Sequence, residues 1–333
     1  MAISIRRREL VLALGGVAAT WPLAARAQQA GGRRIGALIG YAESDPQAQS
    51  RFAGFKQELA ALGWTDGVNL RIDVRWTGGD VTRAAALAKE LVAMQPEVIL
   101  ANTTPVTAAL QHETKTIPIV FVLVSDPIGS GFVKSLSRPG GNITGFLNIE
   151  ASLVEKWAEL LKEIAPGTKR AALMFNPKTA PYAQYYLQPF EASARKLGVT
   201  PSVTQVLSEA EIEKVIVGLG GDPGSGVIMM ADGFMFVHRK AVIELTARHK
   251  VPAIYYFREA AIEGGLISYG VNNADLFRSA APYVDRILRG ARPADLPAQG
   301  PTRYELFVNS KTAEALGLTI PTSLLVAAEE VIE

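Results

Sequence analysis

Short apolar, β-branched runs alternate with longer amphipathic runs along most of this chain. Residues 33–39 predict a buried strand. Residues 49–62 predict a helix, because apolar side chains recur there at three- and four-residue spacing (Phe52, Phe55 and Leu59). Strands separated by helices pair in parallel, since each helix carries the chain back to the start of the next strand. The pattern therefore predicts an α/β fold with doubly wound parallel sheets.

The alternation occurs twice, which predicts two similar lobes. The segments 142–146 and 264–270 are short, apolar and flanked by glycine, unlike the Pro/Ser-rich tether of independent domains. We expect them to cross between the lobes, with one lobe formed by residues 33–146 and 268–300 and the other by residues 147–267 and 301–333. Lobes joined by several short crossings can hinge, and ligand sites favour such clefts.

Residues 1–27 have the parts of an export signal peptide. Arg6-Arg7-Arg8 is positive, residues 10–23 are mostly apolar but too short to span a bilayer, and Ala25-Arg26-Ala27 resembles a cleavage site. The arginine pair ahead of the apolar run indicates the twin-arginine route, and an ordinary Arg-rich secretory signal is the alternative. We expect cleavage after Ala27 and a protein in the periplasm.

Composition excludes several classes of protein. The chain has 34 Lys+Arg and 32 Asp+Glu, and its first 27 residues hold four Arg and one Glu, which leaves 30 basic against 31 acidic residues. No basic run is long enough to follow a nucleic-acid backbone, so no nucleic-acid partner is expected. Cysteine is absent, which rules out disulfides, thiolate metal sites and a lipid-modified cysteine. No later apolar run is long enough to predict a membrane span.

Polar side chains follow the predicted strands, at the edge where ligands of doubly wound sheets bind. Thr104 and Asn176 each precede a proline, as helix caps do, and a helix start offers free N–H groups to an anion. Asp126 and Asp232 could receive an ammonium group, and tyrosines could stack on an apolar ligand. Each residue alone could equally be structural. The predicted ligand-binding residues are Tyr41, Thr103, Thr104, Ser125, Asp126, Asn176, Asp232, Tyr256 and Tyr269.

Motifs for catalysis and for cofactors are missing from the sequence. The three histidines, His112, His238 and His249, fall on predicted helices without the spacing of a zinc motif. The Gly-rich segment 218–226 follows a helix and precedes a strand, whereas a phosphate-binding loop follows a strand and opens a helix. We therefore expect a protein that is not an enzyme and that has no cofactor and no metal.

Several segments resemble those of one known family. They are Thr116–Phe121 with Ser125-Asp126-Pro127, the block Ser137–Gly145, Arg258-Glu259 with Gly264–Gly270, and the tail from Tyr283 to Pro321. They are similar to the extracytoplasmic substrate-binding proteins of ABC importers, in the branch associated with aromatic or hydrophobic amino acids. The resemblance covers nearly all of the chain after the signal. It implies the type I periplasmic binding protein fold, with a ligand between two hinged lobes.

The resemblance also implies a function and partners. The protein would be the periplasmic solute-binding component of an ABC importer, a monomer that traps an amino acid or related small carboxylate. Its closed form would dock on an inner-membrane permease that works with a cytoplasmic ATPase. An extracytoplasmic sensor that reports to a membrane kinase is the alternative. The sequence departs from the family in lacking a lipid-attachment cysteine and in placing Ala260-Ala261 where a bulky residue often follows Arg-Glu.

Overall fold

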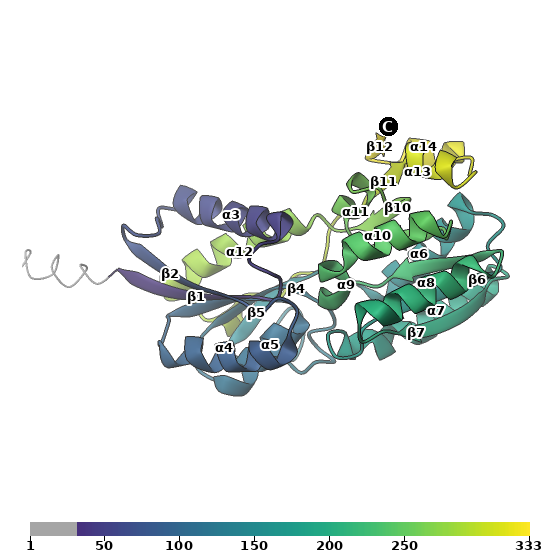
Figure 1. The fold of residues 1–333 in the computed structure, drawn as a ribbon. Helices are drawn as coiled ribbons and strands as arrows, with labels where there is room; N and C mark the ends of the chain where they lie inside the picture. The colour runs from purple at the N-terminus through teal and green to yellow at the C-terminus, as the bar shows by residue number, and fades with distance from the viewer. Residues whose placement is uncertain (1–31) are drawn as a thin grey trace, which may run out of the picture.

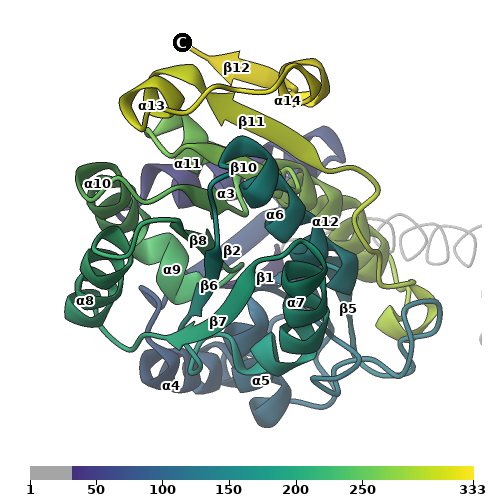
Figure 2. The same ribbon diagram turned by 90° about the vertical axis from the view of Figure 1, so that its right-hand side faces the viewer.

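The protein consists of two α/β lobes that lie side by side, each built on its own sheet (Figure 1). The computed structural model describes residues 32–333, so the predicted export signal lies outside the described residues. Helices cover both faces of the second sheet, as the view from that end shows (Figure 2). Within residues 32–333 we find no helix that is both long and apolar enough to cross a membrane. The predicted two-lobed α/β fold is confirmed.

The first sheet has five parallel strands in the order β2-β1-β3-β4-β5. Helices α3 and α12 pack on one face, and α4 and α5 pack on the other (Figure 1). The edge strand β2 is only half-buried, which explains its alternating sequence. The elements are β1 (Arg33–Ile39), α3 (Pro46–Ala61), β2 (Leu70–Trp76), α4 (Val81–Ala93), β3 (Val98–Asn102), α5 (Thr104–Glu113), β4 (Ile119–Val124), β5 (Ile143–Leu147), α12 (Asn273–Leu288) and the 3-10 helix η3 (Pro293–Asp295).

The second sheet has seven strands in the order β12-β11-β10-β9-β8-β6-β7, all parallel except for the β10–β11 pair. Helices α6 and α7 pack together, as do α8 and α10. Its elements are α6 (Ala151–Ile164), β6 (Arg170–Phe175), η2 (Pro181–Ala183), α7 (Gln184–Lys196), β7 (Thr200–Gln205), α8 (Glu209–Gly220), β8 (Ser225–Met229), α9 (Gly233–Val237), α10 (Arg239–Arg248), β9 (Ala253–Tyr255), α11 (Arg258–Ile262), β10 (Ile267–Gly270), β11 (Glu305–Asn309), α13 (Ser310–Ala315), α14 (Thr322–Ala327) and β12 (Glu330–Ile332).

The chain passes between the two sheets three times: after β5, after β10 and before β11. Between the last two passages α12 returns to the first sheet, where Phe146 forms a bridge with Gln299. Residue 268, expected as a lobe boundary, lies inside β10, because Ser268 pairs with both Tyr255 and Phe307 of the second sheet. The strand pairing therefore places residues 268–270 with the second sheet.

One glycine allows β5 to approach β4 closely. Gly145 has φ 151°, and a Cβ at this position would lie 2.0 Å from the carbonyl oxygen of Phe121. The same strand pair contains a register shift near Leu123, whose φ is 56°. A side chain at position 145 would separate the two strands next to the cleft described below.

Candidate functional site

The strand ends of the two lobes meet across a cleft. Tyr41 follows β1, and its ring lies 4.5 Å from the ring of Phe236 in α9, measured between centroids. Tyr41 is buried, and burial raises the pKa of its hydroxyl above the ordinary 10.0. Because one ring comes from each lobe, the lobes are in direct contact at this point. Ligands of doubly wound folds bind at this end of the strands.

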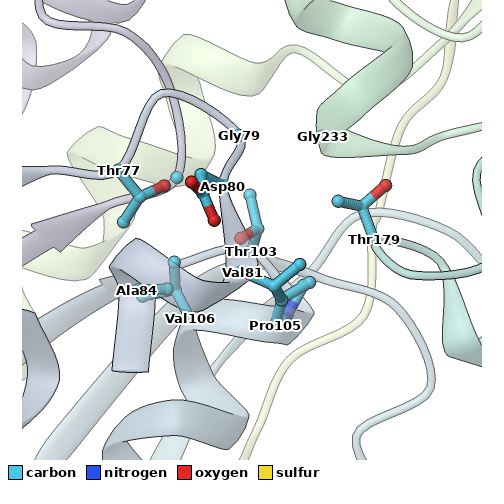
Figure 3. A pocket seen from close by; sticks show the side chains of 11 residues that line it. Thr77, Gly79, Asp80, Val81, Ala84, Thr103, Pro105, Val106, Thr179 and Gly233 are labelled. Atoms are coloured by element: carbon cyan, nitrogen blue, oxygen red, sulfur yellow. The ribbon is translucent and has the colours of Figure 1, made fainter. Parts of the chain in front are cut away.

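A narrow crevice runs between the lobes. Figure 3 shows Thr77, Asp80 and Thr103 on one side of it and Thr179 and Gly233 on the other. The crevice has a volume of about 10 Å³. That is about the room needed by one water molecule. The lobes are therefore closed on one another, and a larger ligand can reach this part of the cleft only when they separate.

A wider groove opens on the other side of the start of α5. Its volume is about 260 Å³. Its described lining residues are uncharged and come from both lobes: Thr104, Pro105, Ala108, Gly129, Ser130, Phe132, Pro181, Tyr182, Gln184 and Tyr185. Tyr185 lies so close to Gly129 that a Cβ at position 129 would be 2.9 Å from Cζ of the tyrosine. These walls suit the apolar or aromatic part of a small ligand.

The backbone beside the start of α5 is strained. Thr103 precedes this helix with φ 82°, and its side chain forms no capping hydrogen bond with the described residues. A β-branched residue with positive φ is a conformational outlier, and such outliers gather at functional sites. Asp126, just beyond β4, also has positive φ. The strand ends of the first lobe are thus held in costly conformations where the cleft narrows.

Two of the predicted polar residues of the first lobe are joined by hydrogen bonds. The backbone N–H of Ser125 donates to Oγ1 of Thr104 at 3.1 Å. Oγ of Ser125 donates to Oδ1 of Asn148 at 2.9 Å. All three residues are buried. The residues that follow β3, β4 and β5 therefore form one hydrogen-bonded cluster. Asn148 belongs to this cluster, although it was not among the residues predicted from the sequence.

Asp232 is a buried carboxylate of the second lobe. Its Oδ2 accepts from the backbone N–H of Asn176 at 2.7 Å, and its Oδ1 accepts from the N–H of Phe234 at 2.9 Å and from the hydroxyl of Thr179. Burial raises the pKa of Asp232 to about 6 from 3.8, although these hydrogen bonds lower it. Asp232 therefore caps α9 and anchors the end of β6.

Two buried tyrosines stand beside Asp232. The hydroxyl of Tyr256 donates to the backbone oxygen of Asp232 at 3.2 Å, and the hydroxyl of Tyr182 donates to the backbone oxygen of Ala231. Burial raises the pKa of both tyrosines well above the ordinary 10.0. Both hydroxyls therefore stay protonated near neutral pH, and both rings remain uncharged walls. Tyr182 was missed from the sequence because the hydrophobic spacing of its segment is that of an ordinary helix.

The structure places Asp126 and Tyr269 in other surroundings. Oδ1 of the half-buried Asp126 accepts from the N–H of Gly129 at 2.9 Å and so closes a turn. The ring of Tyr269 lies 5.6 Å from that of Tyr304, and its carbonyl oxygen accepts from Nε1 of Trp157 at 2.7 Å. For these two residues, contact with a ligand stays a prediction.

Sequence reasoning also missed a buried charge. Arg51 of α3 is 2% exposed, and its Nη2 lies 2.9 Å from Oε1 of Glu259 in the other lobe. Its three side-chain nitrogens form no hydrogen bond of good geometry with the described residues, and the same is true of Nδ2 of Asn102. A signal was present: Arg51 stands four residues before Phe55, on the apolar face of the predicted helix, where a charge needs a buried partner.

Comparison with known proteins agrees with this architecture. The chain is 25% identical over 276 residues to a tyrosine-binding protein of Clostridioides difficile, which is 82% of this chain and 78% of that protein. A structure from Streptococcus pneumonia described as an ABC domain in complex with L-Trp is 28% identical, with a TM-score of 0.83 over 90% of this chain and 100% of that chain. The ligand-free, open structure of a substrate binding protein from Clostridium difficile is 25% identical, with a TM-score of 0.66 over 90% and 99%.

The two structures cover the same share of this chain but differ in their similarity to it. The higher TM-score belongs to the complex and the lower one to the open form, as expected if the lobes are closed here. A family model described as ABC transporter substrate binding protein matches residues 41–332. This match favours a transporter component over a sensor protein, and the resemblance noted in the sequence is confirmed. The chain belongs to the family of ABC transporter substrate binding proteins.

Proposed function

We propose that the protein is the periplasmic component of an ABC importer and that it traps one amino acid with an apolar or aromatic side chain between its lobes. Asp232 is the observation that carries the proposal. It is 3% exposed, and its described partners are hydrogen-bond donors rather than a cation. An ionised carboxylate buried without a cation costs free energy, and a ligand ammonium group placed beside it would offset that cost.

The first lobe offers groups suited to a carboxylate. Thr103, Thr104 and Ser125 are buried at the start of α5, where hydroxyls and backbone N–H groups meet the positive end of the helix dipole. The buried rings of Tyr41 and Tyr256 would cover the ligand body. The uncharged groove beside Tyr182 and Phe132 suits a large apolar side chain. The names of the relatives, which refer to tyrosine and L-Trp, support this ligand class.

Trapping would follow from hinge closure. In this proposal the first lobe comprises residues 33–147 and 271–300 and moves as one body, and the second lobe comprises residues 148–270 and 301–333. A ligand that contacts both lobes binds the closed state more tightly and shifts the protein toward it by that difference in affinity. The closed form would then dock on a membrane permease served by an ATPase. Residues 1–27 would direct a monomeric protein to the periplasm, where it would be free because the sequence has no cysteine for lipid attachment.

A ligand screen by thermal shift tests the proposal. The chain without residues 1–27 would be melted with each L-amino acid, with small carboxylates and with nucleosides. A ligand at 100 times its dissociation constant adds roughly 2.7 kcal/mol to the stability of the form that binds it. We expect the stabilising compounds to be apolar or aromatic amino acids. Stabilisation by nucleosides alone, or by carboxylates without an amino group, would overturn the assignment.

A further inference from the structure

Two ion pairs cross the cleft in opposite directions beside α9. Nη2 of Arg51, in the first lobe, lies 2.9 Å from Oε1 of Glu259 in the second. Nη1 of Arg239, in the second lobe, lies 2.6 Å from Oδ2 of Asp45 in the first. Within the second lobe, Glu263 binds Nε of Arg239 at 3.0 Å and fixes its orientation. Each lobe thus contributes one arginine and one carboxylate to the two ion pairs.

One aromatic ring lies between the two arginines. The guanidinium carbon of Arg51 is 4.6 Å from the centroid of Phe236, and that of Arg239 is 4.4 Å from it. Tyr41 of the first lobe also packs on this ring. Phe236 lies in α9, the short helix that Asp232 caps at its start. The ring that meets the first lobe is therefore four residues from the carboxylate proposed to hold the ligand.

These charges are buried because the lobes are closed. The side chains of Arg51 and Arg239 are 2% and 3% exposed, and the carboxylates of Glu259 and Asp45 are 11% and 14% exposed. When the lobes separate, Arg51 parts from Phe236 and Glu259, and its guanidinium regains water. Losing one partner of a buried pair leaves the other charge unpaired in a poorly solvated place. That penalty falls on the closed state, because both charges are hydrated in the open state.

We propose that Asp45, Arg51, Arg239 and Glu259, arranged around Phe236, form a closure clasp that sets how readily the lobes close and how long they hold a ligand. The ligand-retention part rests on the proposed function, whereas the effect on closure does not. The four charged residues are positioning residues: they act on the lobes and not on the ligand. Asp45 is itself held in place, since its Oδ1 caps α3 by accepting from the N–H groups of Gln47 and Ala48 at 2.9 Å.

Disulfide trapping measures closure without any ligand. A Cβ at Gly79 would lie 3.9 Å from Cβ of Val237 in the other lobe. That separation is suited to a disulfide. The sequence contains no other cysteine, so Gly79→Cys with Val237→Cys would form one bond, and only in the closed state. Gly79 has a φ of 83°, so a cysteine there is strained, but this strain is the same in every variant that is compared. The initial rate of bond formation in a glutathione buffer is the readout.

The clasp variants are compared in this two-cysteine background. We expect Arg51→Met and Glu259→Leu each to slow bond formation at least roughly tenfold, and the double variant to recover much of the rate because neither charge is then left unpaired. Arg75→Met is the matched control, since it breaks an ion pair with Glu90 inside the first lobe, and it should leave the rate within about twofold.

Unchanged rates in Arg51→Met and Glu259→Leu would overturn the clasp. If either variant fails to fold by circular dichroism, Arg51→Lys decides, because it keeps the charge but loses the flat guanidinium that stacks on Phe236. A severalfold slower rate in Arg51→Lys supports the clasp, and an unchanged rate contradicts it. L-tryptophan added to the protein with an intact clasp tests the proposed function separately: failure to accelerate trapping would count against that ligand and leave the clasp result standing.

Discussion

Lowering the pH through 6 should reduce the affinity of this protein for an amino acid, because Asp232 titrates in that range. Burial raises its pKa from the ordinary 3.8 to about 6. A shift of this size corresponds to about 3 kcal/mol of difference between the two protonation states. The carboxyl is 3% exposed, so solvent screens little of this effect.

Protonation of Asp232 has opposite effects on the stability of the free protein and on its affinity for the ligand. Because the pKa in the folded protein lies above that of the unfolded chain, this group contributes stability that is fully present below about pH 4. That contribution, about 3 kcal/mol in total, is lost as the pH rises through 6. An ammonium ligand favours the ionised form instead. If it binds only that form, its affinity should fall up to about tenfold for each pH unit below 6 and stay level between about pH 7 and 8.

Calorimetric titration with L-tryptophan across this pH range is the assay, repeated at about pH 5 in two buffers of different ionisation enthalpy. Close to one proton should be released for each ligand bound. Asp232→Asn should bind more weakly at neutral pH and lose the pH dependence. Asp222→Asn is the matched control and should keep it, since this exposed carboxylate pairs with Arg170 at the beginning of β6, at the opposite end of the strand from Asn176. A flat profile in the unaltered protein, with no proton released, would refute the pairing of Asp232 with the ligand ammonium.

Two further predictions concern export and folding. Replacing Arg7 and Arg8 together by lysine should leave uncleaved precursor in the cytoplasm, as judged by the N-terminal mass; normal appearance of a chain beginning at residue 28 in the periplasm would point to the ordinary secretory route. Gly145→Ala should destabilise the protein by about 3 kcal/mol or more in urea unfolding, because its Cβ would collide with the backbone of Phe121 and its φ is positive; a loss below about 1 kcal/mol would show that β5 can move aside.

Most elements of the fold could be predicted from the sequence, because the spacing of apolar residues within a short segment indicates whether that segment is a strand or a helix. The expected strand 33–39 coincides with β1, and the expected helix 49–62 corresponds to α3. The start of α3 was placed three residues late, since the Asp45-Pro46 cap was not recognised. The strands β11 and β12 were not expected, because five- and three-residue segments become strands only through pairing with a distant β10 and with each other.

The site was less predictable because its residues converge from distant parts of the chain. Thr104, Ser125 and Asp232 were predicted because each follows a strand, and their positions at strand ends depend only on sheet topology. The same reasoning could not find Arg51, whose burial makes sense only with Glu259, more than 200 residues further along the chain. Nor could it foresee that Asp232 would cap α9 and bind the end of β6 at the same time. Such double roles depend on packing between elements, which periodicity does not record.

The central claim is that an amino acid is held at both its charged ends between the two lobes. The most direct test is calorimetric titration of the protein at neutral pH with L-tryptophan, with tryptamine, which lacks the carboxylate, and with indole-3-propionate, which lacks the ammonium group. We predict binding of one L-tryptophan per chain. Each analogue should bind roughly 10- to 150-fold more weakly, the loss of one charge-assisted hydrogen bond. Equal affinity for all three compounds would show that the ring alone is recognised and would contradict the account.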